Sequence, residues 1–170
     1  MSGAPEPHGR FVVVPASYVF LLRGEGADRQ VLLQLRQNTG YMDDHWAAAA
    51  AGHVERGETI FDAARREAAE ELDVHDLDLE FVTVMQRTRY DQPIDERVDF
   101  FFTARSWSGE PRILEQAKCA ALRWCRLDDI DDLSHPVVPH EREVLLLLKN
   151  GYVPTYTSFG FIGSWKRARP

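Results

Sequence analysis

Blocks of β-branched and aromatic residues recur along the chain and predict β-strands. They occupy residues 11–14, 16–23, 30–36, 79–89, 97–107 and 120–127. The turn-rich segment "GEGADR" separates the second and third blocks, so we expect these two to pair as a hairpin. The alanine-rich segment "HWAAAAAGHV" leaves little room for a helix between Trp46 and Gly52, and we expect a short strand or irregular structure there.

Two other segments show the spacing of helices. In residues 59–72, four apolar residues recur at helical intervals and would face the core: Phe61, Ala64, Ala68 and Leu72. Thr59 with Asp62 resembles a capping box at the start of this helix. The segment "PHEREVLLLLKNG" has Pro139 near its first helical position and Gly151 just past its end. The whole pattern predicts a mixed α/β domain with many strands and few helices.

Composition narrows the class of protein. A chain of 170 residues has the size of one domain, and 44% hydrophobic with 28% charged residues is typical of a soluble globular protein. The net charge of −7 argues against general binding to nucleic acid or to an anionic membrane. A compact anionic substrate would therefore need a cation to bridge it to acidic side chains.

Cysteine spacing and the N-terminal residues bear on the cellular compartment. The two cysteines, Cys119 and Cys125, fit neither a C-x-x-C pair nor a disulfide framework, so we expect buried free thiols. No apolar run reaches the ~18 residues of a membrane span. The first ten residues lack the basic-then-apolar pattern of a signal peptide, which predicts a flexible tail on a cytoplasmic protein.

Three glutamates crowd one face of the first predicted helix. Glu67, Glu70 and Glu71 stand at positions i, i+3 and i+4, where like charges repel. From spacing alone, the favoured interpretation is a surface helix whose acids pair with Arg65 and Arg66. The alternative is a divalent cation that neutralises the cluster, because Mg²⁺ prefers oxygen ligands and is commonly shared with substrate phosphates.

The residues around this cluster favour the cation. The stretch "GHVERGETIFDAARREAAEELDV" resembles the Nudix box, G-x5-E-x7-R-E-U-x-E-E-x-G-U with U apolar. Six specified positions match, at Gly52, Glu58, Arg66, Glu67, Glu70 and Glu71. With residue frequencies of roughly 7% each, the chance of such a match is on the order of 10⁻⁵. The second glycine of the box is Asp73 here, and Asp tolerates left-handed backbone, so we expect the helix end to survive.

Resemblance to the Nudix hydrolase superfamily, and within it to the MutT-like group, implies an α/β fold. Its form is an α/β/α sandwich around a mixed β-sheet. The likeness covers residues 11–161, which we interpret as a single domain between tails at 1–10 and 162–170. The segment "TSFGF" near its end is similar to the end of actinobacterial members.

The same resemblance assigns the site residues by their position in the box. The implied catalytic and metal-binding residues are Glu67, Glu70 and Glu71, with Glu115 and the backbone carbonyl of Gly52 or Ala51 as further ligands of Mg²⁺ or Mn²⁺. The three box glutamates would also position or deprotonate the attacking water. Glu58 and Arg66 would form a supporting ion pair. Glu115 is assigned from the run "WSGEPRILE", because MutT-like members carry a further acid after a later strand and turn.

Most Nudix proteins hydrolyse a nucleoside diphosphate linked to a further group X, which implies a small-molecule nucleotide substrate here. We expect metal-dependent cleavage of a nucleoside triphosphate, or an oxidised form such as 8-oxo-dGTP, to monophosphate and pyrophosphate. Arg36 either contacts phosphate or is an ordinary surface arginine. Tyr90 lies near the position of a base-stacking tyrosine in diadenosine-polyphosphate hydrolases, so a dinucleoside polyphosphate is an alternative substrate. A nucleotide-binding regulatory module without turnover is a further alternative, and family habit suggests a homodimer.

Overall fold

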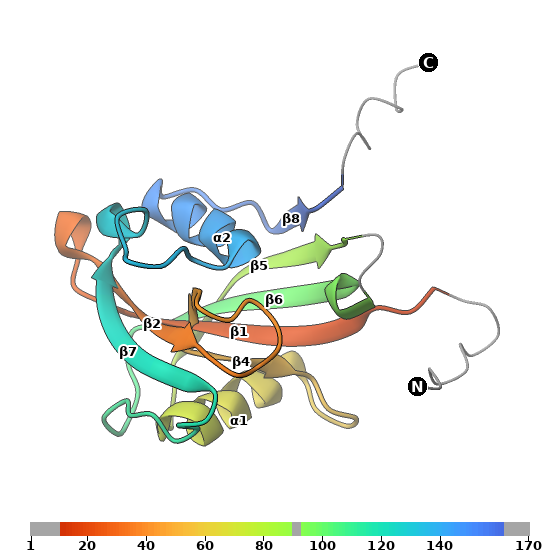
Figure 1. The fold of residues 1–170 in the computed structure, drawn as a ribbon, viewed down its shortest axis with the longest axis horizontal. Coiled ribbons are helices and arrows are strands. Elements are labelled where there is room, and N and C mark those ends of the chain that lie inside the picture. Colours follow the sequence, from red (N-terminus) through yellow and green to blue (C-terminus); the bar gives the residue numbers. More distant parts are fainter. Residues whose placement is uncertain (1–10, 90–92, 162–170) are drawn as a thin grey trace, which may run out of the picture.

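A mixed β-sheet forms the middle layer of the molecule, with α1 (Ile60–Leu72) on one face and α2 (Pro139–Lys149) on the other (Figure 1). The computed structural model describes residues 11–89 and 93–161. Within these residues the strands are β1 (Val14–Arg23), β2 (Gln30–Arg36), β3 (Trp46–Ala48), β4 (Ala50–His53), β5 (Leu79–Arg87), β6 (Arg97–Ala104), β7 (Cys119–Arg126) and β8 (Tyr156–Phe159). Short 3₁₀ helices cover Gly26–Asp28, Pro93–Asp95 and Leu127–Asp129. The predicted α/β/α sandwich around a mixed sheet is confirmed.

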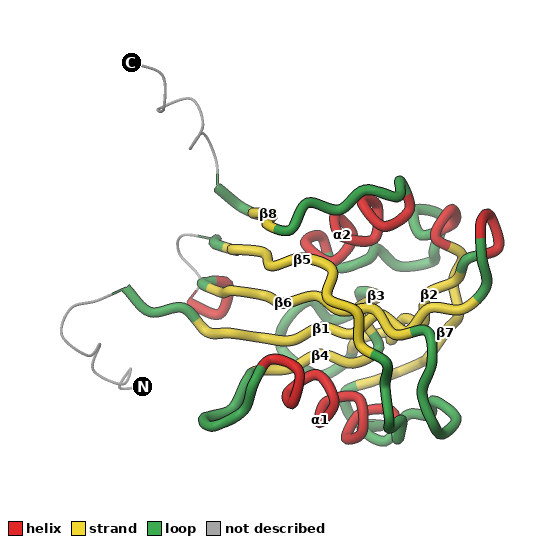
Figure 2. Tube along the Cα trace, turned by 180° about the vertical axis from the view of Figure 1, so that it is seen from behind, coloured by secondary structure: helices red, strands yellow, loops and turns green. Residues whose placement is uncertain are grey.

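The topology of the sheet is organised around β1. This strand pairs antiparallel with β2 and β4, and parallel with β6. Beyond β6, β5 runs antiparallel, and β8 pairs parallel with β5. Both β3 and β7 pair with β2. The view from behind in Figure 2 shows β8 at the edge of the sheet beyond β5. The β1–β2 pairing confirms the predicted hairpin.

Strand boundaries differ from the prediction in several places. The sequence suggested a break at Pro15, but β1 starts at Val14 and continues through this proline. A proline is tolerated near the start of a strand, and the Pro15 carbonyl accepts a hydrogen bond from Val54 N at 3.0 Å. The segment around the alanines forms β3 and β4, so the short-strand alternative is correct. The strands β5 and β6 end at Arg87 and Ala104, earlier than predicted.

Helix α1 begins and ends at the residues that the sequence indicated. The Thr59 hydroxyl accepts a hydrogen bond from Asp62 N at 3.1 Å, and the Asp62 carboxylate accepts one from Thr59 N at 3.1 Å, which is a capping box. At the other end Asp73 adopts left-handed backbone, with φ 58° and ψ 35°, and its N–H bonds back to the Ala69 carbonyl. The expectation that aspartate can replace glycine at this helix end is confirmed.

Small residues bring α1 close to the sheet. Ala64, Ala68 and Leu72 are fully buried as predicted, and they pack against alternate residues of β1. The prediction for Phe61 is wrong: its side chain is 37% exposed, although its ring contacts the Phe102 ring at a centroid distance of 4.8 Å. Phe61 and Ala63 both stand in the first turn of α1, but the Phe61 side chain lies at the border of the buried face, whereas Ala63 is fully buried.

Two further observations concern the thiols and the helices. Cys119 and Cys125 are free and buried, as predicted. Neither α-helix in the described ranges has the length and apolar content that a bilayer crossing requires.

Candidate active site

The acidic face of α1 lies against β4, and a glycine makes the close approach possible. A β-carbon on Gly52 would lie 1.9 Å from Glu67 Oε1, so a larger residue at this position would collide with the carboxylate. One residue earlier, Ala51 N donates a hydrogen bond to Glu71 Oε2 at 2.9 Å. Burial differs between the box acids, because the side chain of Glu67 is only 14% exposed whereas that of Glu70 is 60% exposed.

Arg66 ties the helix to the segment before it. Its guanidinium donates to both carboxylate oxygens of Glu58, at 2.6 Å and 3.1 Å, and to the His53 carbonyl at 3.0 Å. The Glu58–Arg66 ion pair that the resemblance implied is therefore present. Arg66 Nη1 also lies 2.7 Å from Glu67 Oε1 and 3.2 Å from Glu70 Oε2. A single cation thus contacts three acids, which offsets part of their repulsion.

Burial and crowding raise the proton affinity of the two inner acids. Burial is the main cause that raises the pKa of Glu71 to about 8, and the charges of Glu67 and Glu115 add to it against the Ala51 N–H donor. The pKa of Glu67 is also raised, mainly by burial, although Arg66 opposes this. These carboxylates are held in positions where a positive charge nearby would stabilise their ionised forms.

Glu115 reaches the same place from a loop far along the chain. The loop between β6 and β7 attaches to the end of α1, since Arg112 N bonds to the Leu72 carbonyl at 3.0 Å and Leu114 N to the Glu71 carbonyl at 3.1 Å. This attachment carries Glu115 to the acidic face, where Lys118 Nζ contacts its Oε1 at 2.9 Å. A surface hollow of about 370 Å³, which we call the acidic hollow, is lined by Ala51, Gly52, His53, Glu55, Glu67, Glu70, Glu71, Glu115 and Lys118.

The donor set of the acidic hollow fits a hard divalent cation. Carboxylate and carbonyl oxygens are the ligands that Mg²⁺ and Mn²⁺ prefer. Across residues 11–89 and 93–161, however, no three Asp, Glu, His or Cys side chains converge closely enough to hold a metal ion as they stand. On the α1 side, the Arg66 guanidinium keeps Glu67 and Glu70 from converging, because it forms ion pairs with both carboxylates. The carboxylate and carbonyl oxygens that could bind a metal lie around one hollow. Rotation of the glutamate side chains would bring these oxygens into one coordination shell.

Of the two predicted substrate contacts, one lies beside the acidic hollow and the other cannot be placed. Arg36 ends β2, and its guanidinium donates to the Tyr41 carbonyl and to Thr39 Oγ1, each at 3.0 Å. It lines a second hollow of about 230 Å³, which we call the connecting hollow and which shares Ala51, Gly52 and His53 with the acidic one. Tyr90 lies outside the described residues.

Sequence reasoning missed a buried charged cluster on the other side of the connecting hollow. Arg87 contacts both Asp95 and Asp99, and Tyr41 donates its hydroxyl hydrogen to Asp95 Oδ1 at 2.6 Å. Arg87 and Asp99 are almost fully buried, although each stands in a strand of mainly apolar residues. A charged residue inside such a strand was the signal that could have found this cluster. His140, at the start of α2, is buried nearby and was also missed.

The sandwich and its acidic hollow define a domain of the nucleotide-pyrophosphohydrolase type. The family model described as NUDIX domain matches residues 13–148, so the chain belongs to the NUDIX family. Among solved structures, the MutT NUDIX hydrolase of Burkholderia pseudomallei is 25% identical with a TM-score of 0.64, over 78% of this chain and 96% of that one. Family and neighbour together support a MutT-like enzyme, and NUDIX hydrolases generally use divalent metal ions. No curated protein matches the chain.

Structures with lower sequence identity share the fold as well. The NUDIX domain of NrtR from Shewanella oneidensis, solved in complex with ADP ribose, is 16% identical with a TM-score of 0.68, over 86% of this chain and 92% of that one. The Ap4A hydrolase of C. elegans is 19% identical with a TM-score of 0.57, over 82% of this chain and 98% of that one. At these identities the likeness concerns the fold alone.

Proposed function

We propose that the chain is a metal-dependent pyrophosphohydrolase that cleaves a nucleoside triphosphate, or an oxidised form such as 8-oxo-dGTP, to the monophosphate and pyrophosphate. One observation carries the proposal. Glu67 and Glu71 are inner carboxylates with raised pKa values, and they share one hollow with Glu70 and Glu115. Such a group of acids is stable in ionised form only with a cation, and an anionic phosphate chain needs the same cation to approach it.

The reaction assigns different tasks to these residues. A water oxygen attacks one of the two phosphorus atoms of the anhydride that joins the monophosphate to the pyrophosphate, the bond from that phosphorus to the bridging oxygen breaks, the other phosphate group leaves with the bridging oxygen, and a carboxylate of the cluster accepts the proton of the water. When bound, Mg²⁺ or Mn²⁺ would supply charge neutralisation on the phosphate oxygens and would lower the pKa of coordinated water. Glu67, Glu70, Glu71 and Glu115 would hold the ion with the carbonyl of Gly52 or Ala51. Glu58 acts as a positioning residue, because it contacts the cluster only through Arg66.

Turnover assays on box variants test this assignment. The purified protein is incubated with Mg²⁺ or Mn²⁺ and a panel of ordinary and oxidised nucleoside triphosphates, diadenosine polyphosphates, ADP-ribose and NADH. Products are resolved by chromatography. We expect one triphosphate to give monophosphate and pyrophosphate, and Glu70→Gln or Glu71→Gln to abolish this turnover with an unchanged circular dichroism spectrum. The exposed Glu143 of α2 offers a matched control, and Glu143→Gln should keep wild-type activity.

A nucleotide-binding module without turnover is the second candidate, and the contacts of Arg66 favour it. The guanidinium lies within ion-pair distance of both Glu67 and Glu70, so it competes with a metal for these acids. Calorimetry that finds tight nucleotide binding, together with no product from any member of the panel under either metal, would support this candidate over the enzyme. Undiminished turnover in both Glu70→Gln and Glu71→Gln would instead remove the proposed site.

A further inference from the structure

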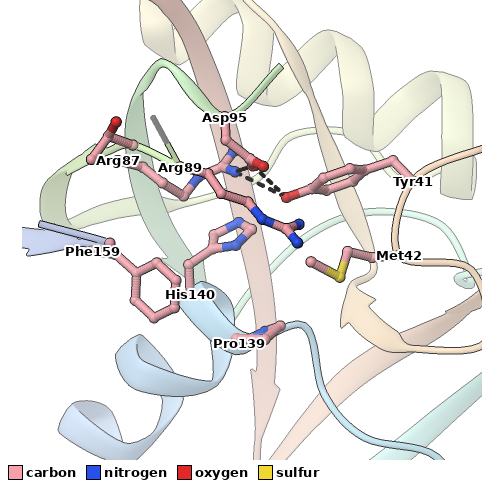
Figure 3. Close-up of a pocket in the computed structure, with 10 residues that line it drawn as sticks. Tyr41, Met42, Arg87, Arg89, Asp95, Pro139, His140 and Phe159 are labelled. Carbon is pink, nitrogen blue, oxygen red and sulfur yellow. Dashed lines mark hydrogen bonds and ion pairs between the residues drawn. The ribbon is translucent and has the colours of Figure 1, made fainter. Parts of the chain in front are cut away.

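An apolar pocket of about 470 Å³ adjoins the connecting hollow, and Figure 3 shows the residues that line it. It lies between the loop after β2, the end of β5, the first turn of α2 and the strand β8. We call it the distal pocket, and its walls include Tyr41, Met42, His140 and Phe159, with the exposed Arg89 at its side. Figure 3 shows the His140 ring between the Phe159 ring and the Met42 side chain.

His140 lines this pocket and also the connecting hollow, and its ring carries a buried polar atom that lacks a hydrogen bond. The side chain is 2% exposed, and its Nε2 has no hydrogen-bond partner in the part of the chain that the structure describes. The closest acidic oxygen, Glu141 Oε1, is 3.9 Å away. Burial, with Arg87 and Arg97 adding to it, holds the pKa of His140 well below its usual range, so the ring is neutral. A neutral imidazole can donate or accept a hydrogen bond, and a buried one without a partner is unfavourable unless a ligand supplies it.

The connecting hollow adjoins both this pocket and the acidic hollow, since it shares lining residues with each. The connecting hollow shares Tyr41, Arg87 and His140 with the distal pocket, and it shares Ala51, Gly52 and His53 with the acidic hollow. Its own lining contributes further cationic side chains, Arg36 and Arg97. The three hollows therefore suit an elongated ligand with an anionic end at the carboxylates and a planar, largely apolar end beside His140.

The strand β8 supplies one wall of the pocket from outside the region that the family model matches. That match ends at residue 148, whereas Phe159 and Gly160 line the pocket. Thr88 N bonds to the Phe159 carbonyl at 3.1 Å, which fixes the strand against β5. At Gly160, with φ +85°, a β-carbon would lie 1.9 Å from the Thr88 carbonyl oxygen, so only glycine allows this approach. On the opposite wall, Met42 also has a positive φ of 48°, which is unusual for methionine.

We infer that β8 and His140 complete a pocket for the heterocyclic base of the nucleotide, with Phe159 and Met42 against the base and the His140 imidazole at its polar edge. His140 and Phe159 are then the residues that determine which base this chain accepts. The inference rests on the proposed function, because the phosphates of the same ligand would occupy the acidic hollow.

Methionine methyl signals provide a test that does not depend on turnover. Protein labelled with ¹³C in the methionine methyl groups is titrated, without metal, with AMP, GMP, CMP, UMP, 8-oxo-dGMP and, as a probe without a base, inorganic phosphate. Met42 lines the pocket, whereas Met85 is 1% exposed in the core and serves as the internal control. We expect at least one monophosphate to shift the Met42 signal, and phosphate to shift neither signal.

Variants then connect the binding to the two named side chains. We expect Phe159→Ala and His140→Ala each to weaken the binding of that monophosphate by about 10-fold or more, as loss of a stacking or hydrogen-bonding partner does. In His140→Ala the differences in affinity between the five monophosphates should become smaller. His140→Gln, which keeps a polar side-chain end, should restore part of the affinity. Tyr156→Ala is the matched control, because Tyr156 belongs to β8 but is 57% exposed and outside the pocket.

The outcomes separate this inference from the proposed function. If triphosphate is hydrolysed but no monophosphate shifts Met42, and the His140 and Phe159 variants keep the wild-type kcat/KM and base preference, the pocket assignment is overturned while the enzyme stands. A Met42 shift from a protein that hydrolyses nothing would support the pocket and overturn the enzyme. If the protein hydrolyses no triphosphate and no monophosphate shifts the Met42 signal, both the enzyme and the pocket assignment are overturned.

Discussion

Arg87 Nε donates a hydrogen bond to Asp99 Oδ2 at 2.8 Å, and both side chains are almost completely buried between β5 and β6. Asp95 contacts the same guanidinium. The positive charge therefore compensates two carboxylates that have no access to water. Burial still raises the pKa of Asp99, with Arg87 opposing it, which shows how strongly this interior disfavours unpaired charge.

Substitution of Arg87 should therefore lower the stability of the folded protein strongly. We expect Arg87→Met to lower the free energy of unfolding by about 3–5 kcal/mol, because it leaves two buried acids without their partner. Urea unfolding followed by circular dichroism measures the change. Arg126→Met is the control: Arg126 faces Asp128 at 3.9 Å on the surface, and such a pair contributes less than about 1 kcal/mol. Equal losses in the two variants would contradict the role of burial.

Gly52→Ala tests the contact between β4 and the acidic face. The new methyl group would displace the Glu67 carboxylate, and a shift of about 1 Å at a reacting group can lower kcat about 100-fold. Gly26→Ala should instead change stability and leave kcat unaffected. Gly26 has φ +54° with nothing within 4 Å of an added β-carbon, so strain of about 1–2 kcal/mol lowers stability without an effect on kcat. Steady-state kinetics and thermal unfolding of both variants check the contrast.

The helix end at Asp73 allows a prediction about the residue that replaces the box glycine. Asp73→Gly relieves the left-handed backbone but removes the exposed Arg112 contact at 2.6 Å, so the two effects oppose each other and we expect only a small change in stability. Since Asp73 donates nothing to the acidic hollow, kcat should stay unchanged. Asp73→Ala keeps the strain and loses the ion pair, and it should be less stable than Asp73→Gly. A reversed order in urea unfolding would refute this account of the helix end.

Glu141 predicts a pH dependence of stability. Burial raises its pKa from 4.5 to about 7, although the Ala48 N–H donor opposes the shift. Between pH 4.5 and 7 the folded state binds more protons than the unfolded state, so the free energy of unfolding falls as pH rises through this range. The loss reaches about 3 kcal/mol at most. Glu141→Gln should make this decline smaller while keeping an acceptor for Ala48 N, and Glu71, whose pKa is also raised, accounts for a remaining decline of the same sign. Unfolding curves of the wild type and the variant, compared at several pH values, would test this predicted pH dependence.

Metal addition should stabilise the folded protein if the acidic hollow binds it. A ligand at 100 times its dissociation constant raises the free energy of unfolding by about 2.7 kcal/mol. We expect Mg²⁺ or Mn²⁺ to raise the melting temperature of the wild type, and EDTA to reverse the effect. The Glu67→Gln/Glu71→Gln variant should show no rise, whereas Glu143→Gln should respond as the wild type does. NaCl at equal ionic strength controls for screening.

Local chemistry explains which parts could be predicted from the sequence. The capping box at Thr59 and the spacing of the box glutamates depend on residues within one helix, so α1 and its acidic face followed directly. Glu115 depended on a loop attachment more than 40 residues from α1's acids, and only the family resemblance placed it. Nothing local marks His140 as buried, because a histidine in the first turn of a helix is ordinarily exposed.

The pocket wall at β8 shows the same limit. Phe159 lines the pocket only because β8 pairs with β5, a partner some 70 residues earlier in the chain. Sequence periodicity over four residues carries no information about such a partner. The prediction for Phe61 fails for a related reason, since a helical repeat predicts which face of α1 is apolar but not how deeply each residue of that face is buried.

The attachment of the Glu115 loop to α1 links helix fraying to site assembly. Arg112 N and Leu114 N bond to the Leu72 and Glu71 carbonyls, which the helix itself cannot satisfy. Opening of the last helical turn must therefore release the loop, and release of the loop removes an acid from the hollow. The amide hydrogens of these loop residues should exchange with solvent as one cooperative unit with the end of α1. Slow exchange at Arg112 and Leu114 would report directly that the hollow is assembled.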